Sequence, residues 1–319
     1  MEVVLSKKWT EDRIKEALSI LTRSHDYSQA LDEIGETSNS LGSAFKRQGL
    51  EAPTSYLANS EDEAVLRKAS VLPEGMRSIV VFNDVHVPFH NKNGVQAVLE
   101  FCRDQQPDAI VINGDFIDCF SISSFAKKPG GPVLQDELDE GLEILDQLRR
   151  YCPLSEITYT EGNHEERLRR LVKEQHGLYR LRAWALESLL EFDRLGIEYL
   201  DYGVIKWFGD LAVYHGQYVS GHAGYTARRE LERGGFRYVI TGHVHRMGLH
   251  HRKGYTGNKI ALENGGLFDI EQCDYMMNPN WMNGFCIVYQ DESRDFTQIN
   301  PIPMEYDGTF VWNNRWYGI

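Results

Sequence analysis

The chain has 319 residues, a formal net charge of −13 at pH 7 and a hydrophobic share of 42%. These values fit a globular protein with one large domain or two, and they provide ample chain for a buried core. The acidic balance argues against a broad basic surface that grips nucleic acid. A nucleic-acid substrate stays open, because bound divalent metals would supply positive charge where a phosphate sits.

Neither a membrane span nor an export signal is expected. No apolar run approaches the roughly 18 residues needed to cross a bilayer. The N-terminal stretch MEVVLSKKWTEDRIKEAL lacks the apolar core of a signal peptide, so we expect a cytoplasmic protein. The five cysteines are scattered and odd in number, which fits reduced thiols and excludes a paired disulfide framework. The oligomeric state is left open.

Residues 1–50 predict a small all-α unit. Apolar residues recur at helical spacing over residues 9–21 and again over 27–34, where Gly35 would end the helix. A further helix near Lys46 and Arg47 makes the segment resemble a helix-turn-helix that contacts nucleic acid. The segment holds seven Lys or Arg against eight Asp or Glu, so docking to protein is an equal alternative. Residues 51–75 predict a linker, because they hold two prolines and no sustained periodicity.

The remaining residues, 76–319, predict one α/β domain. Three short apolar runs that end in polar residues, SIVVFNDVH, DAIVINGDFID and EITYTEGNHE, alternate with the helical patterns GVQAVLEFCRDQ and LQDELDEGLEILDQLRRY. This alternation indicates βαβ units and a largely parallel sheet, whose ligands bind beyond the carboxyl ends of the strands. LAVYHG and FRYVITGHVHR predict two more such strands. The tail from about residue 247 predicts a further antiparallel sheet that packs on the first.

The ends of these five strands share one chemistry, because they carry carboxylate, amide and imidazole side chains. The residues are Asp84, His86, Asp115, Asp118, Asn163, His164, His215, His243 and His245. Carboxylates with imidazoles suit Mn²⁺, Fe²⁺ or Zn²⁺ and suit Ca²⁺ poorly. The set is too large for one tetrahedral ion, whereas two metals about 4 Å apart would use it fully and would promote phosphoryl displacement.

The motifs that carry these residues appear in the order DVH, GDFID, GNHE, HG and GHVH. Together they resemble the calcineurin-like metallophosphoesterase superfamily over residues 78–266, and the stretch from His215 to Arg246 is similar to phage and prophage members. The resemblance implies a two-sheet β-sandwich flanked by helices, with a dinuclear metal centre. The implied cofactors are two divalent transition-metal ions, Mn²⁺ first, with Fe²⁺, Zn²⁺ or Ni²⁺ as alternatives.

The resemblance also implies a role for each matching residue. Asp84, His86 and His245 would bind one metal, Asn163, His215 and His243 the other, and Asp115 would bridge both. His164 would be the general acid that protonates the leaving oxygen, and Asp118 would orient it. A carboxylate that accepts a hydrogen bond from an imidazole fixes its tautomer and favours its protonated form, which agrees with that pairing. Within GNHE, Gly162 would allow a close backbone approach and Glu165 would begin a helix.

The resemblance leaves the substrate open. Protein phosphatases of the superfamily follow the second motif with Arg-Gly, whereas Cys119 and Phe120 stand here. We therefore expect a phosphodiesterase, with a nuclease acting on DNA as its specific form. A phosphomonoesterase acting on phosphoprotein or a small metabolite is the alternative. A binding or scaffold module with a vestigial site is disfavoured, because every expected ligand position is filled.

Several other polar residues lie outside the ligand motifs. His222 matches no ligand motif and is expected in a loop, with contact to substrate phosphate as the less favoured alternative. His90, His250 and His251 are expected at the surface. Arg167 and Arg246 flank motif residues, where each would either reach a phosphate or serve as a solvated or structural ion pair.

Overall fold

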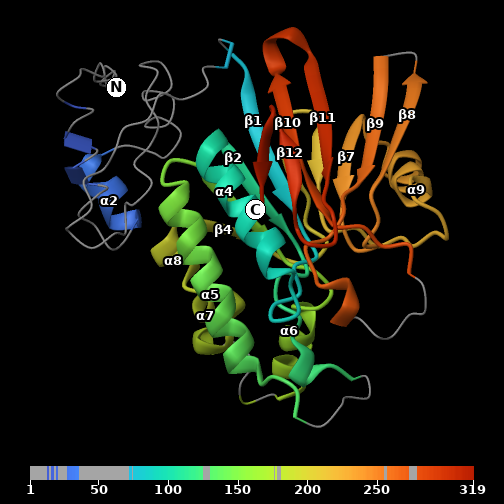
Figure 1. The fold of residues 1–319 in the computed structure, drawn as a ribbon. Coiled ribbons are helices and arrows are strands. Elements are labelled where there is room, and N and C mark those ends of the chain that lie inside the picture. Colours follow the sequence, from blue (N-terminus) through green and yellow to red (C-terminus); the bar gives the residue numbers. More distant parts are fainter. Residues whose placement is uncertain are drawn as a thin grey trace.

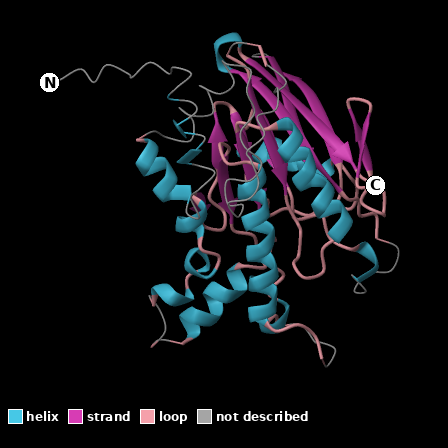
Figure 2. Ribbon diagram, turned by 60° about the vertical axis from the view of Figure 1, so that its left-hand side comes forward, coloured by secondary structure: helices cyan, strands magenta, loops and turns pink. Residues whose placement is uncertain are grey.

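The structure is a computed structural model of the chain. The described residues are 13, 16–17, 19–20, 27–35, 72–73, 75–124, 130–175, 177, 181–254, 257–272 and 279–319. Two sheets lie face to face and helices flank them (Figures 1 and 2). The predicted fold class, an α/β two-sheet sandwich flanked by helices, is therefore confirmed.

The first sheet has six strands in the order β11-β10-β1-β2-β3-β4. Its strands are β1 (Arg77–Phe82), β2 (Ala109–Asn113), β3 (Glu156–Thr160), β4 (Ile197–Leu200), β10 (Gly284–Asp291) and β11 (Phe296–Pro303). β1, β2, β3 and β4 run parallel to one another, as the predicted βαβ units require. β10 and β11 extend the sheet antiparallel on the β1 side.

The second sheet has five strands in the order β5-β6-β7-β9-β8. Its strands are β5 (Lys206–Phe208), β6 (Leu211–Val213), β7 (Tyr238–Thr241), β8 (Gly248–Gly254) and β9 (Gly257–Glu263). A small hairpin of β12 (Phe310–Trp312) and β13 (Arg315–Tyr317) follows near the C-terminus. β6, β7 and β9 are parallel, so the residues after β6 and β7 emerge at one edge.

The helices cover the outer faces of the two sheets. They are α2 (Tyr27–Ile34), α4 (Lys92–Gln105), α5 (Leu134–Tyr151), α6 (Glu166–Glu174), α7 (Leu186–Leu189), α8 (Phe192–Leu195) and α9 (Tyr225–Gly234). Short 3₁₀ turns span Phe120–Ile122, Arg182–Trp184, Ile270–Gln272 and Glu292–Arg294. α4 and α5 lie along the first sheet and α9 lies on the second (Figure 1). The predicted amphipathic helix LQDELDEGLEILDQLRRY coincides with α5.

The core explains why β1, β2 and β10 of the first sheet are apolar on both faces. In β1, Val80 and Phe82 belong to the core that includes α4 and α5, whereas Ile79 and Val81 belong to the core between the sheets. Successive side chains of a strand point to opposite faces, so a strand covered on both faces reads as a continuous apolar run. This double burial holds the carboxyl ends of β1, β2 and β3 in fixed positions.

The predicted arrangement of the C-terminal segment is wrong. It does not form a sheet of its own: β8 and β9 complete the second sheet, while β10 and β11 join the first. The physical reason is visible in β10, where Phe285 and Ile287 face the helix-side core while Cys286 and Val288 face the second sheet. Such a doubly apolar strand is buried fully only inside a covered sheet, here beside β1.

The N-terminal unit is described only in part. α2 ends at Ile34, and Gly35 follows with φ +71°, as the sequence predicts. α2 lies against α8. The second helix of the resemblance, with Lys46 and Arg47, and most of the linker fall outside the described residues, so the helix-turn-helix unit and its partner stay predictions.

Among the described helices, none is long and apolar enough to cross a membrane. The four cysteines in this part of the chain, Cys102, Cys119, Cys152 and Cys286, are free thiols buried in the protein. Their state agrees with the predicted reduced thiols, while Cys273 lies outside the described residues.

Candidate metal centre

The predicted site residues follow the ends of five strands, three from the first sheet and two from the second. Asp84 and His86 follow β1, while Asp115 and Asp118 follow β2. The remaining ones lie beyond β3, β6 and β7: Asn163, His164, His215, His243 and His245. Their side chains meet in three overlapping groups whose possible ligand atoms lie within 4.8 Å of one another, with Asn163 beside one of them.

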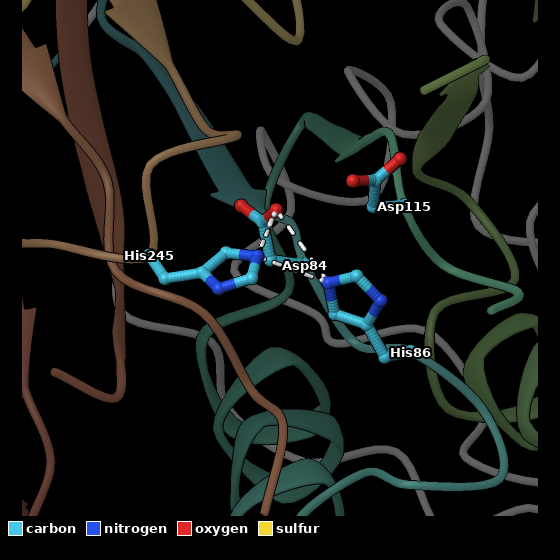
Figure 3. Close-up of side chains that lie close together, drawn as sticks. All are labelled: Asp84, His86, Asp115 and His245. Atoms are coloured by element: carbon cyan, nitrogen blue, oxygen red, sulfur yellow. Dashed lines mark hydrogen bonds and ion pairs between the residues drawn. The ribbon is translucent and has the colours of Figure 1, made fainter. Parts of the chain in front are cut away.

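The Asp84 cluster consists of Asp84, His86, Asp115 and His245, all buried (Figure 3). Nε2 of His86 lies 3.1 Å from Nε2 of His245, which in turn lies 3.2 Å from Oδ1 of Asp84. Oδ2 of Asp84 accepts from Asn83 and from the backbone N–H of His243, but buried Oδ1 has no hydrogen-bond partner. An unpaired carboxylate oxygen facing two imidazole nitrogens is a donor set that a divalent transition metal fits.

The His215 cluster consists of Asp115, His215 and His243, with Asn163 beside it. Nδ1 of His215 lies 2.9 Å from the carbonyl of Asn113 and donates to it, so in the neutral ring Nε2 carries the lone pair. That nitrogen lies 3.1 Å from Oδ2 of Asp115 and 3.2 Å from Oδ1 of Asn163. These three atoms each carry a lone pair, and the lone pairs repel one another unless a cation or a proton lies between them.

The electrostatics of the His215 cluster favour positive charge strongly. Burial alone lowers the pKa of His215, but the carboxylate of Asp115 outweighs it and raises the pKa to about 10. Burial also raises the pKa of Asp115, yet the neighbouring histidines hold it well below the ordinary value of an aspartate. The pocket therefore keeps its carboxylate ionised and suits a cation.

The Asp118 cluster consists of His86, Asp118 and His164. A single oxygen, Oδ2 of Asp118, lies 3.0 Å from Nδ1 of His86 and 3.2 Å from Nδ1 of His164. The carbonyl of Asp118 lies 3.0 Å from the same nitrogen of His164. By accepting from both Nδ1 atoms, Asp118 leaves Nε2 of His86 free for the Asp84 cluster and Nε2 of His164 free to face a substrate.

The same contacts set the charge of His164. Burial lowers the pKa of its imidazole, but the carboxylates of Asp115 and Asp118 outweigh burial and raise the pKa to about 9. For Asp118, hydrogen bonds from the two histidines overcome the effect of burial and hold its pKa well below the ordinary value. The two residues therefore form an ion pair whose geometry fixes the imidazole ring.

The backbone at the site adopts unusual conformations. Five residues of the clusters have left-handed φ angles although none is a glycine: Asp84 (51°), His86 (55°), Asp115 (51°), His243 (70°) and His245 (59°). Such conformations are costly for residues with a Cβ and persist where surrounding structure enforces them, often at functional sites. Here they turn the chain sharply after each strand, so that two nearby residues reach the same centre.

Close backbone packing around the carboxylates requires glycine at two positions. A Cβ on Gly162 would lie 2.1 Å from Oδ1 of Asp115, and a Cβ on Gly242 would lie 2.6 Å from Oδ2 of Asp84. Real Cβ atoms do not approach so closely, so the glycines of the GNHE and GHVH motifs admit the carboxylates. The predicted close approach at Gly162 thus has a specific partner, Asp115.

Glu165 does more than precede α6, and the sequence analysis missed its larger role. Its buried carboxylate accepts hydrogen bonds from five donors on three segments: the backbone N–H groups of Asp115, Phe116, Ile117 and Gly162, and the hydroxyl of Tyr159. These bonds tie the segment after β2 to the segment after β3. The only signal in the sequence was an acidic residue inside GNHE, which does not distinguish a helix start from an inward side chain.

The polar residues outside the motifs divide into three groups. His222 is an exposed loop residue whose ring contacts Tyr225, and His251 is exposed on β8. The expected exposure of His90 is wrong: a β-bridge to Phe268 holds its segment inside, so that 6% of the residue is exposed. Arg246 is buried and hydrogen-bonds Ser220 and Asn280, so its role is structural.

Comparisons with known proteins agree with this arrangement. The sequence profile described as calcineurin-like phosphoesterase matches residues 77–247, which is more than half of the chain. The Gene 54 protein of Mycobacterium phage L5 is 29% identical over 244 residues, covering 71% of this chain and 94% of the relative. The Gene 54 protein of Mycobacterium phage D29 is 30% identical over 241 residues, with the same two coverages.

Solved structures are similar at a lower level. The metallophosphoesterase from Sphaerobacter thermophilus shares 15% identity with a TM-score of 0.41, covering 72% of this chain and 89% of that one.

The close approach of Gly162 to Asp115 generates a test of the geometry. Gly162→Ala should lower the free energy of unfolding by about 1–3 kcal/mol, because its Cβ would displace a buried carboxylate. It should also reduce Mn²⁺ bound per chain, measured by elemental analysis after dialysis. Gly221→Ala is the matched control, since a Cβ there meets nothing within 4 Å. Unchanged melting and metal content in Gly162→Ala would contradict the packing described.

Proposed function

Since the chain belongs to the calcineurin-like phosphoesterase family, we propose that it hydrolyses phosphodiester bonds with two divalent metal ions. DNA is the proposed substrate, which would make the protein a nuclease. The observation that carries the proposal is the convergence of all nine sequence-predicted residues in overlapping clusters at one edge of the two sheets.

The donor set supports two ions that share one ligand. Asp84, His86 and His245 would hold the first, while Asn163, His215 and His243 would hold the second. Asp115 contributes to both the Asp84 cluster and the His215 cluster, which supports its assignment as the bridge. Mixed nitrogen and oxygen ligands suit Mn²⁺, with Fe²⁺, Zn²⁺ or Ni²⁺ as alternatives.

When bound, two such ions would supply Lewis-acid activation of water and would stabilise negative charge on the phosphate. During hydrolysis the water oxygen bonds to phosphorus, the bond to the leaving oxygen breaks, and the leaving oxygen takes up a proton. We assign that proton to Nε2 of His164, since Nδ1 is committed to Asp118 at 3.0 Å from its carbonyl. Asp118 thus acts as the positioning residue of the acid.

The segment after Asp118 favours a diester over a phosphoprotein. In the protein phosphatases of the superfamily an arginine follows this motif, whereas Cys119 is buried here and Phe120 packs edge-to-face on Phe89 at 5.2 Å. The described part of this segment, residues 119–124, carries no arginine or lysine of its own for the doubly charged phosphate of a monoester. A phosphomonoesterase acting on protein or a small metabolite remains the alternative.

The first experiment compares substrate classes. Hydrolysis of bis-p-nitrophenyl phosphate and p-nitrophenyl phosphate should be measured with added Mn²⁺, with single-stranded and duplex DNA alongside. Preference for the diester together with DNA cleavage would support the proposal, and preference for the monoester would support the alternative. A folded protein that binds metal and hydrolyses none of these substrates would contradict both.

The second prediction concerns the shared ligand. The wild-type protein should bind two Mn²⁺ ions per chain, and Asp115→Asn should weaken both sites together, because one carboxylate is proposed to serve both. Calorimetric titration with Mn²⁺ measures each site. Asp139→Asn, an exposed substitution on α5, is the control for the loss of one negative charge. Loss of a single ion in Asp115→Asn would show that the carboxylate does not bridge.

The third prediction concerns the acid. His164→Ala should slow turnover by roughly a hundredfold or more while leaving the metal content nearly unchanged. The loss should shrink for p-nitrophenolate esters, whose leaving group needs no proton. Equal losses on good and poor leaving groups would mean that His164 positions substrate and donates no proton.

Asp118→Asn should behave differently from His164→Ala, because its carboxylate also accepts from His86 at 3.0 Å. We expect both slower turnover and weaker Mn²⁺ binding, by roughly tenfold or more, as for substitutions of groups that orient metal ligands. Parallel metal titrations of the two variants provide the comparison. Wild-type Mn²⁺ affinity in Asp118→Asn would disprove its link to the Asp84 cluster.

A further inference from the structure

We propose that Arg167 binds a non-bridging oxygen of the substrate phosphate and holds it beside His164. The proposal rests on the proposed function and assigns a residue to phosphate recognition within the same site. From the sequence, Arg167 either reaches a phosphate or serves as a solvated or structural ion pair, and its contacts favour the first.

The position of Arg167 is fixed by the acid and its carboxylate partner. The residue lies in the first turn of α6, directly after the GNHE motif. One terminal nitrogen, Nη1, donates to the carbonyl of Asp118 at 2.9 Å and lies 3.7 Å from its carboxylate. The other, Nη2, lies 3.0 Å from Nε2 of His164. With 19% of the side chain exposed, the guanidinium stands at the rim of the site and remains accessible.

The contact between Arg167 and His164 indicates an acceptor-binding position. Asp118 holds Nδ1 of His164, so Nε2 is the nitrogen assigned to the leaving oxygen. Nη2 of Arg167 lies 3.0 Å from that Nε2. A phosphate whose leaving oxygen meets Nε2 would therefore bring a non-bridging oxygen within reach of the guanidinium, and hydrogen bonds between a guanidinium and an anion are stronger than those to neutral groups.

The other arginines near the site are committed elsewhere. Arg169 pairs with Glu161 at 2.8 Å and with Asp201 at 2.9 Å, and Arg170 pairs with Glu166. Arg246 holds two loops through Ser220 and Asn280. Arg167 differs from them because each of its described polar contacts is to a residue of the Asp118 cluster.

Binding of inorganic phosphate to the Mn²⁺-loaded full chain tests the proposal directly. Calorimetry should show that Arg167→Ala weakens phosphate binding by about ten- to a hundredfold, the loss typical of a hydrogen bond to a charged group. Arg167→Lys should be intermediate, because it keeps the charge and loses the planar fork. Arg170→Ala is the matched control on the same helix and should bind phosphate like the wild type. Metal content should be equal in all four proteins.

Steady-state kinetics distinguish two possible roles of Arg167, which are to bind the phosphate or to position the acid His164. If Arg167 anchors phosphate, Arg167→Ala should raise KM more than it lowers kcat, to a similar extent for good and poor leaving groups. Wild-type phosphate affinity combined with a kcat defect confined to poor leaving groups would overturn the proposal, since Arg167 would then only position His164. If the wild type binds phosphate but hydrolyses no ester, the proposed function fails, and the calorimetric comparison still decides the role of Arg167.

Discussion

The site depends on the buried carboxylate of Glu165, which joins the segment after β2 to the segment after β3. The chain after β2 and the chain after β3 both leave the sheet at its carboxyl edge, where strand pairing no longer constrains them. Glu165 accepts from three consecutive backbone N–H groups on the first segment, Asp115 to Ile117, and from Gly162 on the second. A buried carboxylate is stable only with such a set of donors.

This bonding explains why the clusters tolerate electrostatic strain. Burial and the nearby charge of Asp115 both raise the pKa of Glu165, which means that they disfavour its ionised form. Hydrogen bonds from the five donors offset this effect. The same donors orient Asp115, whose Oδ1 accepts from the backbone of His164 while Oδ2 faces His215. Repulsion among the converging electron-pair donors is therefore contained by the backbone network, and a cation that binds there would stabilise the folded chain by mass action.

Much of the site was predictable because the relevant signal is local. Short apolar runs that end in Asp, His or Asn place those side chains at the edge of a parallel sheet, and Asp84, Asp115 and His215 all lie there. The features that were missed depend on packing partners distant in sequence. The inward direction of Glu165 and the burial of His90 beneath Phe268 are set by contacts that no spacing rule encodes. β10 was assigned to the wrong sheet for the same reason, since its partner β1 lies about two hundred residues earlier.

Asp118 couples the position of a proposed metal ligand to the position of the proposed acid. One oxygen of its carboxylate contacts both a proposed metal ligand, His86, and the proposed acid, His164, whose rings meet edge-to-face at 4.5 Å. A movement of the Asp118 carboxylate therefore changes its contacts with both rings. The position of the acid is therefore coupled to the position of the ligand through a single atom. Arg167 adds a third constraint, since its guanidinium donates a hydrogen bond to the carbonyl of the same aspartate. Metal binding, phosphate binding and proton donation would thus share one small rigid unit, which reduces the reorganisation needed to align them for reaction.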